Sequence, residues 1–168
     1  NILAVKVDGP TKEDLVWGFR SGFLTFGSAG LTPTHYDALM KKIVGTLRAT
    51  ISNCSRPAQS ILKKALEKPG YQKEKETFLA QMKSRYLKVK EVLKKHASDE
   101  SLEALPFNSG YFMSFKTKLP AETIRQRLLN NEGIGTIAIT EHTLRVAYCS
   151  IDEENIEALY AAIYRQAH

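Results

Sequence analysis

The sequence has little cysteine and no long apolar run. Its two cysteines, Cys54 and Cys149, lie far apart in a chain of 168 residues, and the four histidines form no spaced cluster. This usage suggests neither a zinc site nor a disulfide framework, and it is typical of a reducing cytoplasm. No apolar segment reaches the roughly 20 residues that span a bilayer, and no signal-peptide pattern opens the chain. We therefore expect a cytoplasmic protein with no bound metal and no membrane partner.

Charge of one sign is in excess, since the formal net charge is +6. A basic chain can bind nucleic acid by releasing counterions, which makes a nucleic-acid module one alternative. Much of the excess lies between Lys63 and Lys95, however, where basic residues interrupt apolar ones at helical spacing. The apolar set comprises Tyr71, Phe78, Met82, Tyr86, Val89 and Leu93. We interpret the lysines as the solvated face of a helix, and we expect no nucleic-acid partner.

Strand and helix patterns alternate along the chain. The sequence predicts strands at 1–7, 19–26, 111–117, 134–139 and 143–149. It predicts helices at 33–48, 58–67, 71–97 and 120–133. A last helix is expected after a cap at Asp152, or at Ser150 with Glu153. Its core face would comprise Ile156, Leu159, Tyr160 and Ile163. Interleaved strands and helices indicate an α/β layered domain.

The first predicted loop carries the most informative motif. Thr11-Lys12 follows a strand and a strong turn, and Gly18, Arg20 and Gly22 come six, eight and ten residues after the lysine. A single lysine is more often a solvated surface residue than a reactive one, and with 24 lysines and arginines one such offset arises by chance. The agreement of all these positions, directly after a strand, is the reason to treat Lys12 as a functional residue.

This pattern resembles the cofactor-lysine signature of the class I and II aminotransferases. Gly110-Tyr111-Phe112 is similar to the small-domain strand entry of these enzymes, and residues 144–150 are similar to the strand that bears their substrate-carboxylate arginine, here Arg145. The resemblance implies the α/β architecture of a fold type I aminotransferase. Residues 1–52 would then be the end of the large cofactor-binding domain with the lysine loop. Residues 53–168 would be the interdomain helices and the small C-terminal α/β domain.

The resemblance also implies a chemistry. The cofactor would be pyridoxal 5′-phosphate, and the enzyme would transfer an amino group between an α-amino acid and a 2-oxo acid. Lys12 would form the Schiff base and move the proton, while Arg20 and Thr11 would hold the cofactor phosphate. Arg145 would bind the substrate α-carboxylate through two parallel hydrogen bonds. Arg48 would bind a distal carboxylate across a homodimer, although a helix C-terminus also favours arginine through its dipole alone.

Two features leave alternatives open. Glu13 and Asp14 place carboxylates beside an amine that must be neutral or paired. The segments that these enzymes place before the lysine strand are absent from the sequence. We therefore expect the C-terminal part of a longer enzyme, inactive on its own. A non-catalytic interaction or regulatory module built on the small domain is the alternative, and it would keep Arg145 but have no use for Lys12.

Overall fold

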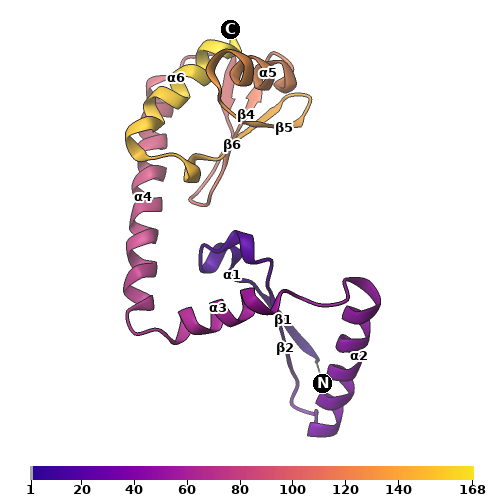
Figure 1. Ribbon diagram of the computed structural model, residues 1–168. Coiled ribbons are helices and arrows are strands. Elements are labelled where there is room, and N and C mark those ends of the chain that lie inside the picture. The colour runs from indigo at the N-terminus through magenta and orange to yellow at the C-terminus, as the bar shows by residue number, and fades with distance from the viewer. Residues whose placement is uncertain (1) are drawn as a thin grey trace. The chain divides into compact units, whose positions relative to one another are not determined.

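The computed structural model describes residues 2–168 and divides into two compact units (Figure 1). The first unit is Asn1–Lys75 and the second is Glu76–His168. Asn1, with which the first predicted strand begins, lies outside the described residues. Helices and strands are mixed in both units, as the predicted α/β class requires.

The first unit is built on an antiparallel ribbon of β1 (Ala4–Asp8) and β2 (Phe23–Gly27). The connection between them holds the short helix α1 (Pro10–Glu13) and a 3₁₀ turn, η1 (Trp17–Phe19), where we expected a loop and then a strand from residue 19. That strand prediction is wrong at its start, because Arg20 has a left-handed backbone with φ 49°. A strand requires an extended backbone at every residue, so β2 begins only at Phe23.

Two helices complete most of the first unit, α2 (Pro33–Thr50) and α3 (Arg56–Glu67). Thr32 caps α2 as expected, and its side chain and that of His35 form a reciprocal capping box with Pro33 at the first helical position. The predicted break at 52–57 is too long, because Pro57 lies inside the first turn of α3, where the missing N–H costs nothing.

The longest helix, α4 (Tyr71–Lys95), begins in the first unit and continues into the second. Its buried residues are Val89 and Val92, and the latter was absent from the predicted apolar face. Phe78, which we placed on that face, is 57% exposed, so this part of the prediction is wrong. Met82, Tyr86 and Leu93 pack against the core as partly buried residues. Only the second half of α4 therefore follows the predicted periodicity into a core.

The second unit contains a four-stranded antiparallel sheet in the order β3-β4-β6-β5. The strands are β3 (Leu102–Ala104), β4 (Met113–Thr117), β5 (Ile137–Thr140) and β6 (Thr143–Val146). The sequence did not predict β3, a three-residue edge strand. It also extended the last strand to residue 149, whereas Tyr148–Ser150 forms the 3₁₀ turn η2.

Helices α5 (Ala121–Glu132) and α6 (Ile156–Ala167) pack with α4 on this sheet. Gly133, with φ 67°, ends α5 where the sequence predicts, since a left-handed residue stops a helix. Asp152, one of the predicted caps, is the N-cap residue of a 3₁₀ turn, η3 (Glu153–Asn155), that runs directly into α6, whose own N-cap is Asn155. The Asp152 side chain makes no capping hydrogen bond and pairs with Arg85. The predicted core face of α6 is buried throughout.

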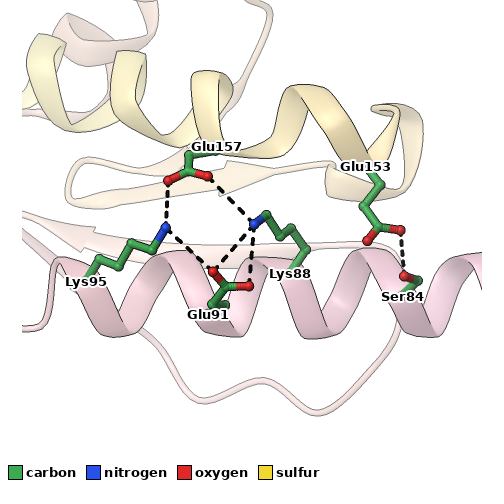
Figure 2. Close-up of polar contacts among 6 residues, drawn as sticks. All are labelled: Ser84, Lys88, Glu91, Lys95, Glu153 and Glu157. Atoms are coloured by element: carbon green, nitrogen blue, oxygen red, sulfur yellow. Dashed lines mark hydrogen bonds and ion pairs between the residues drawn. The ribbon is translucent and has the colours of Figure 1, made fainter.

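An ion-pair network fastens α6 to α4 within the second unit (Figure 2). Glu157 accepts from Lys95 at 2.6 Å and lies 3.6 Å from Lys88. Glu91 lies between the two lysines, 3.4 Å from Lys88 and 3.5 Å from Lys95. These charges are largely exposed, so they contribute little to the free energy of unfolding and act mainly on the alignment of α6 along α4. The apolar core between the same helices supplies most of the stability.

Candidate functional site

The predicted cofactor lysine lies on α1, inside the connection from β1 to β2. Pro10 is the buried residue of this helix, and its carbonyl oxygen accepts from the backbone N–H groups of Asp14 at 3.0 Å and Val16 at 3.2 Å. Lys12 is exposed, and Thr11 is half-buried beside it. One end of the helix is therefore anchored by burial, while Lys12 lies on its exposed side.

Arg20 follows η1 in the same connection and is also exposed. Its guanidinium donates to the Trp17 carbonyl oxygen over 3.4 Å, longer than an ordinary N–H···O hydrogen bond. A left-handed backbone at a residue other than glycine costs about 1–2 kcal/mol, so the surrounding loop must hold Arg20 in this conformation. Gly22 shows how tightly the loop closes, because a Cβ there would lie 3.3 Å from the Asp8 carbonyl oxygen. No such crowding occurs at Gly18.

Lys12, Thr11 and Arg20 thus lie on the same connection, between β1 and β2 of the first unit. An amine, a hydroxyl and a guanidinium are the groups that a phosphorylated aldehyde requires, since the amine condenses with the aldehyde and the other two bind the phosphate. The residues present fit pyridoxal phosphate in kind. Their exposure also means that this connection alone does not exclude water from a bound cofactor.

Arg48 lies near the end of α2 and binds the chain that follows. Its guanidinium donates to the carbonyl oxygen of Ser52 at 3.2 Å and to the Ser52 hydroxyl oxygen at 3.1 Å. Ser52 has φ 67°, so the arginine braces a left-handed residue just after the helix. With these contacts Arg48 caps the end of a helix. This is the alternative to the predicted role of Arg48, in which it binds a distal carboxylate.

Arg145 lies in the second unit, at the centre of β6. Ser114 of β4 and Ile137 of β5 are its partners across the sheet, and directly paired residues point to the same face. Its neighbours in sequence, Leu144 and Val146, are buried on the opposite face among the helices. Arg145 therefore projects from the face of the sheet that the core does not cover, as a ligand-binding side chain must.

An aromatic residue that the sequence did not single out lies against this arginine. The Arg145 guanidinium carbon is 5.4 Å from the centre of the Phe112 ring, a cation–π geometry. Phe112 belongs to the Gly110-Tyr111-Phe112 segment, which the sequence marked only as a strand entry, and its ring is 39% exposed. Residue spacing carries no signal for this contact, because it depends on the register of β4 against β6.

The turn after β6 is held by partly buried hydrogen bonds. The Tyr148 hydroxyl donates to the Gly110 carbonyl oxygen at 2.7 Å, and Arg85 of α4 donates to the Cys149 carbonyl oxygen. Burial raises the pKa of Tyr148 to about 12, so this hydroxyl keeps its proton at neutral pH. These bonds fix the segments that precede β4 and follow β6, on which Phe112 and Arg145 depend.

Residues 2–168 were compared with the requirements of a metal site and of a membrane-spanning helix. No group of three or more histidine, cysteine, aspartate or glutamate side chains lies close enough to hold a metal ion. Within the same described range, no helix has the length and apolar character needed to cross a bilayer. Both cysteines are free thiols.

Comparison with known proteins finds a matching family and similar solved structures. The sequence profile of the family "Aminotransferase class I and II" matches residues 9–163. A search of curated proteins gives no significant match. Among solved structures, an aminotransferase from Anaerococcus prevotii is 25% identical with a TM-score of 0.72, over 96% of this chain and 38% of its own. The α-aminoadipate aminotransferase LysN from Thermus thermophilus, complexed with N-(5′-phosphopyridoxyl)-L-leucine, is 18% identical with a TM-score of 0.73, over 97% and 41%.

An aspartate aminotransferase double mutant from Thermus thermophilus gives the same fold, with 18% identity and a TM-score of 0.71 over 96% of this chain and 41% of its own. The chain thus spans about two fifths of the length of these structures. The predicted fold, part of a fold type I aminotransferase, is confirmed, and pyridoxal phosphate is the cofactor that this family implies. The chain belongs to the class I and II aminotransferases.

Proposed function

We propose that this chain is the C-terminal part of an enzyme that transfers an amino group between an α-amino acid and a 2-oxo acid, with pyridoxal phosphate bound to Lys12. The observation that carries the proposal is the position of Lys12. It is exposed on a helix between two paired strands, with Thr11 and Arg20 on the same connection and within the segment that matches the family. The phosphopyridoxyl ligand of LysN supports the same cofactor and an amino acid substrate.

The composition of the first unit's surface supports a missing partner domain. A two-stranded ribbon is marginally stable at best, and the segment from Ile2 to Ile51 leaves large apolar side chains in contact with water. They include Ile2 at 84%, Val7 at 75%, Trp17 at 74%, Met40 at 64%, Val44 at 52% and Ile51 at 62% exposed. An apolar surface of this kind is normally covered by further structure. This is the basis for proposing that residues 1–52 are the remnant of a large cofactor-binding domain, although the compact unit runs on to Lys75.

Each site residue has a distinct proposed task. Pyridoxal phosphate, when bound, supplies an electron sink for the substrate carbon. The Lys12 amine would take up and return the proton at that carbon. Arg20 and Thr11 neutralise and orient the phosphate through charged and neutral hydrogen bonds. Arg145 orients the substrate by its α-carboxylate, and Phe112 stiffens the guanidinium from beneath.

The remaining expectations belong to the same proposal. The homodimer and the cytoplasmic location follow from the family resemblance and from cysteine usage, and they stay predictions. Arg48 as a distal-carboxylate ligand also stays a prediction, since its contacts to Ser52 already give it a structural task. The first unit exposes apolar side chains that further structure would normally cover. For this reason we expect the chain alone to be inactive.

Reduction with borohydride in the presence of pyridoxal phosphate tests the assignment of Lys12. The full-length protein that contains this chain should carry one labelled peptide, with the label on Lys12. A Lys12→Arg variant should lose the label, whereas Lys42→Arg, an exposed lysine of α2, should keep it. A label spread over surface lysines would reject the enzyme proposal and favour the non-catalytic module built on the small domain.

A further inference from the structure

A partly buried cluster of three polar side chains lies beside the lysine helix, inside the first unit. The Tyr71 hydroxyl donates to Oδ1 of Asp14, and the Lys75 ammonium lies 3.2 Å from the same oxygen. The side chains of Asp14 and Lys75 are only 13% and 20% exposed. We call this cluster the Asp14 latch. It joins positions 57 and 61 residues apart, so it is a tertiary contact and not a feature of the loop alone.

Local structure brings the three side chains together. Tyr71 and Lys75 are four residues apart at the start of α4, and side chains with that spacing lie on one face of a helix. The chain enters this helix through Gly70, whose φ of 91° allows the sharp turn out of α3. Asp14 is the residue that ends α1, two positions after Lys12. The latch therefore attaches the end of the lysine helix to the first turn of α4.

The charges in the latch are compensated. A carboxylate with this little exposure loses hydration, and it keeps its charge at low cost only where hydrogen bonds and an opposite charge replace the water. Lys75 supplies the charge and Tyr71 supplies the hydrogen bond. Burial, together with the bond to Asp14, raises the pKa of Tyr71 to about 12, so the hydroxyl remains a donor at neutral pH. The Asp14 carboxylate is thus bound by two side chains of α4.

The lysine connection needs such an anchor. Leu15 and Arg20 both hold left-handed backbone conformations, with φ of 60° and 49°, and neither is glycine. Conformations of this kind persist only where the surroundings over-determine them. Pro10 fixes the start of α1 by burial, and Asp14 is held at the other end. Between these two fixed points lies Lys12.

We propose that Asp14 is a positioning residue, held by Tyr71 and Lys75, which fixes the direction in which α1 presents the Lys12 amine. This inference rests on the proposed function of Lys12. It also accounts for an acidic residue so close to a reactive amine, because the Asp14 carboxylate is engaged by α4. The latch thus holds the lysine connection against the first turn of α4, within the first unit.

Hydrogen exchange of the Val16 amide reports the latch without any cofactor. This N–H donates to the Pro10 carbonyl oxygen, and it exchanges with solvent only when the connection opens. In the full-length protein without cofactor, Tyr71→Phe and Asp14→Ala should each speed this exchange by about ten- to a hundredfold, the range for losing a hydrogen bond to a charged group. Asp37→Asn and Tyr36→Phe, exposed positions on α2, should change it less than twofold.

The double variant separates a latch from independent packing effects. Once Asp14 is alanine, Tyr71→Phe should add less than a twofold further increase, because the bond that it removes is already gone. Additive effects of the two substitutions would overturn the proposal, and so would unchanged Val16 exchange in folded single variants. If Asp14→Ala fails to fold, the Tyr71→Phe variant alone decides, since it keeps the ring and removes only the hydroxyl.

Borohydride labelling then connects the latch with Lys12. Tyr71→Phe should lower the fraction of the label on Lys12 at least severalfold, while the Tyr36→Phe control keeps the wild-type fraction. If the wild-type protein is not labelled at Lys12, the proposed function fails even where the exchange data show a latch. If labelling at Lys12 is intact but indifferent to Tyr71→Phe, the function stands and the positioning role of Asp14 is rejected.

Discussion

Replacement of Arg145 by lysine distinguishes a substrate ligand from an ordinary strand residue. Lysine keeps the positive charge but replaces a planar fork of donors by a compact ammonium, which cannot bind a carboxylate through two parallel hydrogen bonds. The position suits the test, because Arg145 projects from the open face of the sheet while its neighbours Leu144 and Val146 are buried. The substitution therefore changes recognition without disturbing the core.

The size of the effect follows from the contacts of the guanidinium. Losing one partner of a desolvated charged pair costs on the order of 2 to 5 kcal/mol, which corresponds to a roughly thirtyfold to several thousandfold loss of kcat/KM. The free energy of unfolding should hardly change. The cation–π contact with Phe112 at 5.4 Å contributes about 0.5–1 kcal/mol at a partly exposed site, and lysine retains part of it.

The assay compares two quantities in the full-length enzyme, kcat/KM for an amino acid substrate and the thermal midpoint of unfolding. Arg125→Lys is a matched control. Arg125 also makes a forked contact, to both carboxylate oxygens of Glu122 at 2.6 and 2.7 Å, but on the surface of α5. We expect Arg145→Lys to lose activity with a nearly unchanged midpoint, and Arg125→Lys to keep full activity. Unchanged kcat/KM in Arg145→Lys, or a loss that merely tracks a lower midpoint, would remove Arg145 from the site.

Two further predictions concern the second unit. Phe115 is fully buried and its ring contacts those of Tyr160 and Tyr164, so Phe115→Ala should cost about 3–5 kcal/mol in urea denaturation, and a loss under 1 kcal/mol would contradict the core described above. A hydrogen bond from Lys95 and nearby lysine charge lower the pKa of Glu157 below 4.5, so its contribution to stability is complete above that pH and is lost as the pH falls through the lowered pKa. Glu157→Gln should therefore lower the unfolding midpoint at pH 7 but not in strong acid, and a difference that persists in acid would show that the charge is not responsible.

Helix termini were the most predictable part of the fold. Thr32-Pro33 and Gly133 have local chemistry that sets where a helix begins or ends, and the structure follows both signals. Strand boundaries were less predictable. An apolar run predicts a strand whether or not one of its residues is left-handed, so nothing in the sequence signals the backbone conformation of Arg20. The three-residue strand β3 exists because β4 offers it hydrogen bonds, which is a tertiary cause.

The candidate site divides in the same way. Lys12, Arg20 and Arg145 stay predicted site residues, selected because motif spacing is visible in the sequence. The side chains that contact them or hold their neighbours are not visible in it. Phe112 lies under Arg145 through strand register, and Tyr71 reaches Asp14 across 57 residues. Phe78 was assigned to the core because helical periodicity identifies an apolar stripe but does not say how far along the helix a core extends to cover it.

The uneven distribution of buried residues between the two units has a consequence for how the polypeptide acquires its structure. Every member of the buried cluster lies between Val89 and Ala167, and two of the three strand pairings of that unit, β3 with β4 and β5 with β6, join strands that are consecutive in sequence. Short-range pairing lowers contact order, which speeds folding. Glu76–His168 thus contains what a self-nucleating unit requires, whereas the ribbon and α2 have few interior partners of their own. Until further structure covers it, the exposed apolar surface of the ribbon and α2 is a target for chaperones, whereas Glu76–His168 can fold around its own core.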